Sequence, residues 1–156
     1  MPMAHGKRET STRTWPPSLL PASGRGVNAG TGIKFATGMA YRPDQWLLSV
    51  AEGHSKWVYS SQIAADGTLI NKERFFHLHV ADWDDDAVAE CVRYSIEGRQ
   101  FITTKSSIQI RADDGPTQVI LTVSDQVRVT CVSIGGKNKD ALFVVCGNKI
   151  WMRKIQ

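Results

Sequence analysis

The chain has 156 residues and a formal net charge of +4 at pH 7. A chain of this length buries one ordinary hydrophobic core, so we expect a single folded domain. No stretch is long and apolar enough to span a membrane, and no apolar segment follows the N-terminal charges, which argues against a transmembrane helix and a secretory signal. These properties favour a soluble cytoplasmic protein.

Residues 1–30 differ in composition from the rest of the chain. They hold four of the six prolines and most of the net positive charge, and their few apolar residues follow neither a helix nor a strand period. We interpret them as a disordered or vestigial Pro/Gly-rich basic leader, followed by one folded domain at 31–156. Because residues 31–156 mix acidic and basic side chains, the sequence argues against a nucleic-acid-binding face.

A strand–turn–strand phrase recurs three times in the folded part, beginning at Gly38, Cys91 and Cys131. The predicted strands are, in chain order, 32–35; 39–41, 46–52, 57–63 and 74–80; 91–94, 100–104, 108–111 and 118–123; and 129–134, 141–146 and 149–155. Repeats of several short strands are typical of a β-propeller or a related β array. We therefore predict an all-β, propeller-type fold of about three four-stranded blades. The last blade has three strands, and 32–35 is an extra strand.

Two sets of side chains have ordinary structural interpretations. The tryptophans Trp46, Trp57 and Trp151 recur at strand positions, so we expect them between blades. The three cysteines are odd in number and lack CxxC spacing, so we expect buried thiols rather than a disulfide scaffold or a standard zinc site. The acidic run at 82–86 lacks the spacing of an EF-hand, which favours a solvated loop over a calcium loop.

Five phrases of the chain follow one another in a particular order and spacing: GIKFATGMAYRPDQ (32–45), VYSSQIAADGTL (58–69), FFHLHV (75–80), SIQI (107–110) and LFVVCGNKI (142–150). Together they resemble the C-terminal half of the senescence-marker-protein/gluconolactonase/luciferin-regenerating-enzyme family. The resemblance implies half of a six-bladed propeller. It also implies hydrolysis of sugar lactones at a divalent metal in the central channel.

The resemblance also implies where functional residues would lie. Thr37 stands where the family has a metal-ligating Asn, and a hydroxyl is a poorer donor to a hard cation than an amide carbonyl. Glu90 stands where the family has an Asp that is a metal ligand and presumed general base. Cys131 follows Thr130 in place of a Ser-Asn phrase, and Ser95 replaces an Asp after the second strand–turn. The candidates are thus Glu90 as catalytic residue, Thr37 and Glu90 as metal ligands, and Cys131 and Ser95 as channel-lining residues. A further alternative is that Cys131 and Glu90 together form a soft zinc site or a nucleophilic site.

These substitutions favour a non-catalytic or vestigial half-propeller scaffold that is inactive alone. The alternative is a lactone hydrolase using calcium, zinc or manganese, completed by dimerisation or by a separate N-terminal half. A truncated gene product is a third hypothesis. Because a three-stranded blade leaves an open edge that the extra strand of a second copy would fill, we predict a homodimer by strand exchange that closes into a six-bladed ring. A small sugar lactone is the implied ligand. We expect neither nucleic acid nor a membrane as a partner.

Overall fold

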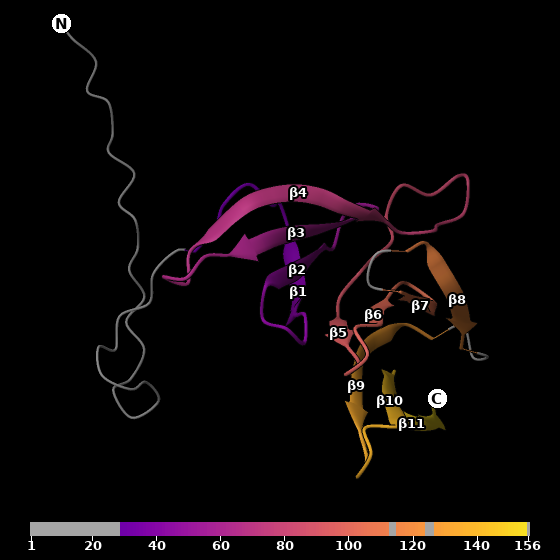
Figure 1. Cartoon of the computed structure of the whole chain (residues 1–156). Helices are drawn as coiled ribbons and strands as arrows, with labels where there is room; N and C mark the ends of the chain where they lie inside the picture. The colour runs from indigo at the N-terminus through magenta and orange to yellow at the C-terminus, as the bar shows by residue number, and fades with distance from the viewer. Residues whose placement is uncertain (1–28, 113–114, 124–126, 156) are drawn as a thin grey trace, which may run out of the picture. The chain divides into compact units, whose positions relative to one another are not determined.

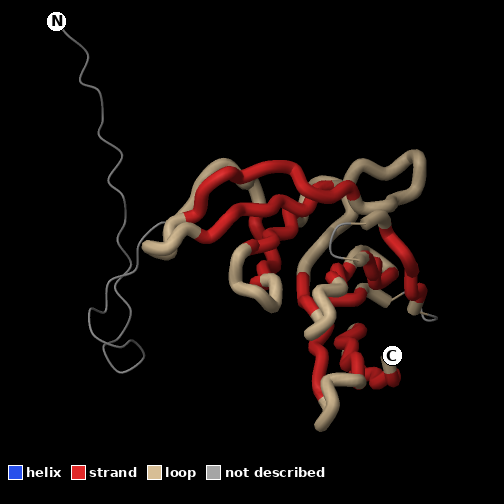
Figure 2. The backbone as a smooth tube through the Cα atoms, in the orientation of Figure 1, coloured by secondary structure: helices blue, strands red, loops and turns tan. Residues whose placement is uncertain are grey.

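In a computed structural model of the chain, the described residues are 29–112, 115–123 and 127–155. The chain divides into a unit at Met1–Thr31 and a compact unit at Gly32–Gln156, and the second unit carries all of the described strands. Figure 2 shows these strands joined by loops, with no helix among the described residues. Accordingly, none of them belongs to a helix that could cross a membrane. The leader predicted at 1–30 lies, apart from its last two residues, outside the described residues.

The strands form three antiparallel sheets that follow one another along the chain (Figure 1). The first sheet contains β1 (Ala36–Tyr41), β2 (Leu47–Glu52), β3 (Trp57–Ile63) and β4 (Leu69–His77). The middle sheet contains β5 (Val92–Tyr94), β6 (Gln100–Thr103), β7 (Ser107–Arg111) and β8 (Thr117–Thr122). The third sheet contains β9 (Val129–Gly135), β10 (Ala141–Cys146) and β11 (Lys149–Lys154). Each sheet pairs its strands in sequence order, so each is one meander of hairpins.

The predicted all-β fold, with two four-stranded sheets and one three-stranded sheet, is confirmed. Strand β4 begins at Leu69, well before the predicted residue 74. A tight turn explains the early start, because the Asp66 carboxylate accepts a hydrogen bond from the Thr68 amide at 3.0 Å and Gly67 adopts φ +84°. The first half of β4 is polar and exposed, so its sequence lacks the apolar alternation on which the prediction relied.

The extra strand predicted at 32–35 is wrong. The structure describes no strand there, and the segment instead continues along the end of β2. The Phe35 carbonyl accepts a hydrogen bond from the Gly53 amide at 2.9 Å, and the Lys34 amide donates to the Glu52 carboxylate at 2.9 Å. The segment therefore has local partners that its short apolar pattern did not reveal.

Two hydrophobic clusters hold successive sheets together. The first joins the first and middle sheets and consists of Ala51, Val58, Phe76, Leu78, Ala87, Ala89, Val92 and Ile102. The second joins the middle and third sheets and consists of Cys91, Phe101, Ile108, Ile110, Val129, Val132, Leu142, Val144 and Cys146. Trp46 and Trp151, which were expected in the core between blades, are instead about half exposed, at 50% and 46%.

Polar contacts reinforce the junction between the first and middle sheets. The buried Gln109 amide holds the backbone of His79, accepting from its N–H at 3.0 Å and donating to its carbonyl at 2.6 Å. The hydroxyls of Ser49 and Tyr94 lie 2.7 Å apart and link β2 to β5. These contacts fix the start of the middle sheet, where the candidate residues lie.

Candidate functional site

The candidate site lies where the first strands of the three sheets meet. Strand β5 lies beside both β1 and β9. Gly38 on β1 approaches the middle sheet so closely that a Cβ there would lie against the Glu90 carbonyl oxygen and 2.8 Å from the Cα of Cys91. A glycine is therefore required for this approach, and the close packing brings Thr37 to the start of β5.

The Thr37 side chain connects the first two sheets. Its hydroxyl donates a hydrogen bond to the Ala89 carbonyl at 2.6 Å and also lies 3.3 Å from the Ala51 carbonyl. The short bond connects β1 to the residue that precedes Glu90. The Thr37 hydroxyl thus stabilises the junction of two sheets in this structure.

Glu90 is held by a basic residue that the sequence analysis did not identify. One carboxylate oxygen, Oε1, accepts a hydrogen bond from Nη2 of Arg128 at 2.6 Å, although the two residues are 38 positions apart. Arg128 directly precedes β9, so this ion pair connects the middle and third sheets. The other oxygen, Oε2, is buried and has no hydrogen-bond partner among the described residues. One oxygen of the carboxylate is therefore hydrogen-bonded to a guanidinium, while the other has no hydrogen-bond partner among the described residues.

These residues do not fit a hard divalent cation. Such a cation needs about six to eight oxygen ligands. Glu90 supplies one unpaired carboxylate oxygen, and Thr37 already donates its proton to a carbonyl. The positive charge of Arg128, 2.6 Å from Glu90, would repel a metal ion bound there. Among the described residues, no group of three or more His, Cys, Asp or Glu side chains is arranged to hold a metal ion.

Cys131 lies beside a second cysteine that was not predicted to be near it. The sulfur atoms of Cys131 and Cys91 are 2.8 Å apart, and both residues carry free thiols. The amide of Val132 also donates to the Cys91 sulfur at 3.4 Å. Burial, followed by the hydrogen bond with Cys131, raises the pKa of Cys91 to about 11. The sulfur pair connects β9 to the residue that precedes β5.

Ser95 lies apart from the other candidates. It follows β5, whereas Glu90 and Cys91 precede it. Ser95 is buried in the turn before β6, where its hydroxyl accepts a hydrogen bond from the Arg99 amide at 3.2 Å. A hydrogen bond from Ser95 also lowers the pKa of Glu97. The structure thus brings Thr37, Glu90 and Cys131 to one end of β5 and gives Ser95 a role in the turn at the other end.

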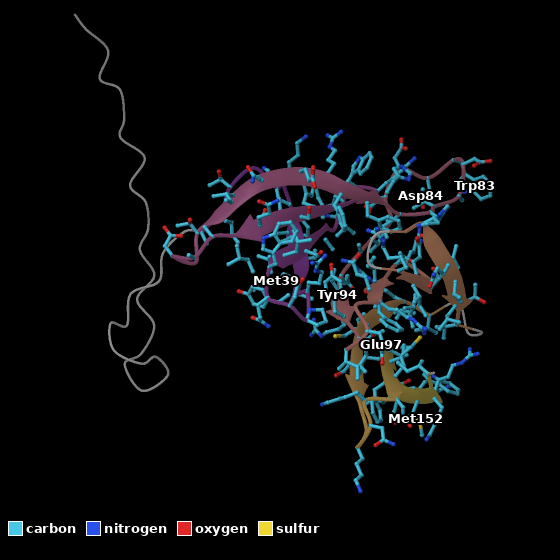
Figure 3. All side chains as sticks on the ribbon, viewed as in Figure 1. Met39, Trp83, Asp84, Tyr94, Glu97 and Met152 are labelled. Carbon is cyan, nitrogen blue, oxygen red and sulfur yellow. The ribbon has the colours of Figure 1, made fainter. Side chains whose placement is uncertain are left out.

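The acidic run at 82–86 belongs to the loop between β4 and β5, where Figure 3 labels Trp83 and Asp84. Its carboxylates form ion pairs with neighbouring basic side chains. Lys56 lies 2.6 Å from Asp85, and Lys105 lies 3.7 Å from Asp84. The structure thus supports the interpretation of this run as a solvated loop.

Comparison with solved structures identifies the architecture. A luciferin-regenerating enzyme matches with a TM-score of 0.63 and 19% identity over 73% of this chain and 38% of its own. A gluconolactonase from Xanthomonas campestris matches with a TM-score of 0.62 and 16% identity over 78% of this chain and 38% of its own. The calcium-binding protein regucalcin from Agrobacterium tumefaciens matches with a TM-score of 0.62 and 14% identity over 75% of this chain and 39% of its own. The chain has the fold of part of a β-propeller.

The predicted resemblance to these proteins is therefore confirmed at the level of the fold, and the chain spans about two-fifths of their length. Neither a protein-family model nor a curated protein sequence matches the chain. At these identities the likeness extends to the arrangement of the sheets. Function must be argued from the residues of this chain.

Proposed function

We propose that this chain is a non-catalytic half-propeller scaffold, and that a second copy completes it to a six-bladed ring with two-fold symmetry. The observation that carries the proposal is a pair of exposed apolar sheet faces, one on the first sheet and one on the third.

The outer face of the third sheet is formed by β10 and β11. Leu142 and Val144 of β10 point into the core, so the alternating residues Phe143 and Val145 point away from the middle sheet. Phe143 lies opposite Met152 on β11, and Val145 lies opposite Ile150. Ile150 is 74% exposed and Met152 is 62% exposed. Four apolar side chains (Phe143, Val145, Ile150 and Met152) therefore form one exposed patch, which we call the C-terminal face.

The outer face of the first sheet has a similar character. Gly38 and Ala40 of β1 face the middle sheet, so Met39 and Tyr41 point the other way. Met39 lies opposite Val50, which in turn lies opposite Tyr59. A groove of about 780 Å³ continues this face, and its lining combines the aromatic Phe35 and Trp57 with several charged side chains. We call this surface the N-terminal face. Figure 3 labels Met39 on the first sheet and Met152 on the third.

We infer that a second copy of the chain covers both apolar faces. Monomeric proteins rarely leave large contiguous apolar patches exposed. In a six-bladed ring made of two copies, the C-terminal face of one copy would pack on the N-terminal face of the other, and the two-fold axis would repeat this contact. The number of sheets agrees with this arrangement, because two copies supply six. Strand β11 is also an edge strand with all six residues exposed, so its backbone is open to pairing with a second copy.

The contacts of Glu90 and Thr37 favour a scaffold over a hydrolase. In a metal-dependent hydrolase the carboxylate would coordinate the cation and hold a water molecule. Here the guanidinium of Arg128 neutralises Glu90, and the Thr37 hydroxyl bonds a backbone carbonyl. Both side chains connect neighbouring sheets. One observation favours the hydrolase. Oε2 of Glu90 is buried and has no hydrogen-bond partner among the described residues, so the lactone hydrolase is kept as the second candidate.

The first experiment measures the solution mass of the full chain by light scattering over a range of concentrations. We expect twice the monomer mass of 17.3 kDa. Ile150→Lys places a charge in the C-terminal face and should return the protein to the monomer mass. The matched control is Ile120→Lys on β8 of the middle sheet, also an exposed isoleucine, which should leave the dimer intact. A folded wild-type protein that stays monomeric at every concentration would overturn the ring.

A thermal unfolding series with calcium, zinc and manganese separates the two candidate functions. A scaffold should show no rise in melting temperature with any of the three ions. A ligand that binds only the folded state raises this temperature by mass action. A rise that is absent in Glu90→Gln would therefore favour the hydrolase over the scaffold.

A further inference from the structure

A close pair of cysteines lies outside the function proposed above. The sulfur atoms of Cys91 and Cys131 are 2.8 Å apart. This separation is less than about 1 Å longer than a disulfide bond of about 2.05 Å. Both residues are free thiols in the structure. The side chains already point at each other, so joining them would require a shift of less than about 1 Å.

The pair lies at a structurally important junction. Cys91 directly precedes β5, and Cys131 lies on β9, so the two sulfurs face each other between the middle and third sheets. They are 40 positions apart in sequence, and a bond between them would close a long loop. Cys91 is only 4% exposed, whereas Cys131 is partly exposed. Cys131 is therefore the sulfur that a dissolved oxidant reaches first.

We propose that Cys91 and Cys131 are a site of reversible oxidation, at which an intramolecular disulfide locks the middle sheet to the third sheet. The oxidant is a low-molecular-weight disulfide such as oxidised glutathione. The thiolate of Cys131 attacks one sulfur of the oxidant, forming a mixed disulfide and releasing one glutathione thiolate, which takes a proton from water. The Cys91 sulfur then attacks Sγ of Cys131, loses its own proton to the departing sulfur, and releases the second glutathione as a thiol. Two protein thiols are thus oxidised while one glutathione disulfide is reduced to two thiols.

The environment of Cys91 agrees with this order of events. Cys91 is only 4% exposed, so a dissolved oxidant does not reach its sulfur first. It needs only to complete the second, intramolecular step, in which the target sulfur is already adjacent. The third cysteine, Cys146, is buried, and its sulfur contacts the Val127 carbonyl at 3.3 Å. Cys146 is therefore an internal control within the same cluster.

The test exposes the full-length protein to a series of glutathione redox buffers, blocks remaining thiols with an alkylating agent under denaturing conditions, and measures the intact mass. Oxidised protein should lose two hydrogen atoms and take up a single alkyl group, and peptide mapping should place the alkyl group on Cys146. The melting temperature should rise by roughly 5–15 °C on oxidation and return when the protein is reduced. This reading needs no variant, so it does not depend on a mutant that folds.

Variants then identify the sulfurs. Cys146→Ser should still form the disulfide, while Cys131→Ser should keep two free thiols in every buffer and show no rise in melting temperature. Three alkylated cysteines in strongly oxidising buffer would overturn the proposal. So would a stable glutathione adduct on Cys131, or a disulfide that joins two chains. All of these outcomes are read under denaturing conditions, so the readout does not require the ring to form.

Discussion

The close approach of Gly38 to the middle sheet gives a sharp prediction about stability. In Gly38→Ala the new methyl group would meet the Glu90 carbonyl oxygen and the Cα of Cys91, both of which are backbone atoms of a packed junction. Backbone cannot rotate away as a side chain does, so β1 must move from β5. Overpacking of this kind lowers the free energy of unfolding by about 1–3 kcal/mol. Because backbone must be displaced here, we expect a loss near the upper end, at about 3 kcal/mol. The assay is urea unfolding at equilibrium, followed by far-UV circular dichroism.

The matched control is Gly115→Ala, where the nearest atom to the new methyl is 3.4 Å away and belongs to the Ala112 side chain. This variant should stay within about 0.5 kcal/mol of wild type. A Gly38→Ala protein as stable as the control would refute the reasoning, because it would show that β1 and β5 are not in contact in solution. The slope of the urea transition should be equal in all three proteins, which ensures that the midpoints report stability.

Two further predictions concern polar groups. Gln109→Ala removes both hydrogen bonds to the His79 backbone and should lower the free energy of unfolding by about 1–3 kcal/mol. The control Gln118→Ala changes an exposed side chain and should leave the urea midpoint nearly unchanged. Faster hydrogen exchange at the His79 amide in Gln109→Ala would locate the effect. Burial raises the pKa of Glu52, but hydrogen bonds from Ser55, the Lys34 amide and Tyr59 outweigh it, so the net shift is downward from 4.5. Glu52 therefore contributes stability that is present above pH about 4.5 and lost as the pH falls below it. Glu52→Gln should be less stable at neutral pH and should flatten this acid limb; an unchanged acid limb would contradict the assignment.

Most of the fold could be predicted because its strands are short, apolar and separated by strong turn residues. The strands from Leu47 to Ile63 and from Val129 to Lys154 begin and end within about one residue of their predicted bounds. Two of the differences have a common cause. The first half of β4 is an exposed outer strand, and the segment at 32–35 pairs through Phe35 with the end of β2. In both places hydrogen bonding to a neighbour decides the structure, and side-chain pattern does not report it.

The contacts of the candidate site could not be predicted residue by residue. The Glu90–Arg128 ion pair joins residues 38 positions apart, and nothing in the composition around Arg128 distinguishes it from other basic residues of the folded part. Likewise, the sequence showed a carboxylate at Glu90 but not that one oxygen is hydrogen-bonded to Arg128 while the other has no partner among the described residues. Such facts depend on the distance between sheets, which local sequence patterns do not specify.

The cysteine pair, by contrast, was within reach of the sequence. The repeated phrase begins at Gly38, Cys91 and Cys131, so these residues occupy equivalent positions in successive units. In a β-propeller the equivalent inner strands are neighbours. The structure bears this out at both junctions, since Gly38 packs against Cys91, and Cys91 lies 2.8 Å from Cys131. A small residue at this position permits close packing, and two thiols at it lie close enough for an oxidant to join them. Repeat register thus predicts contacts between distant residues where the pattern within a single strand does not.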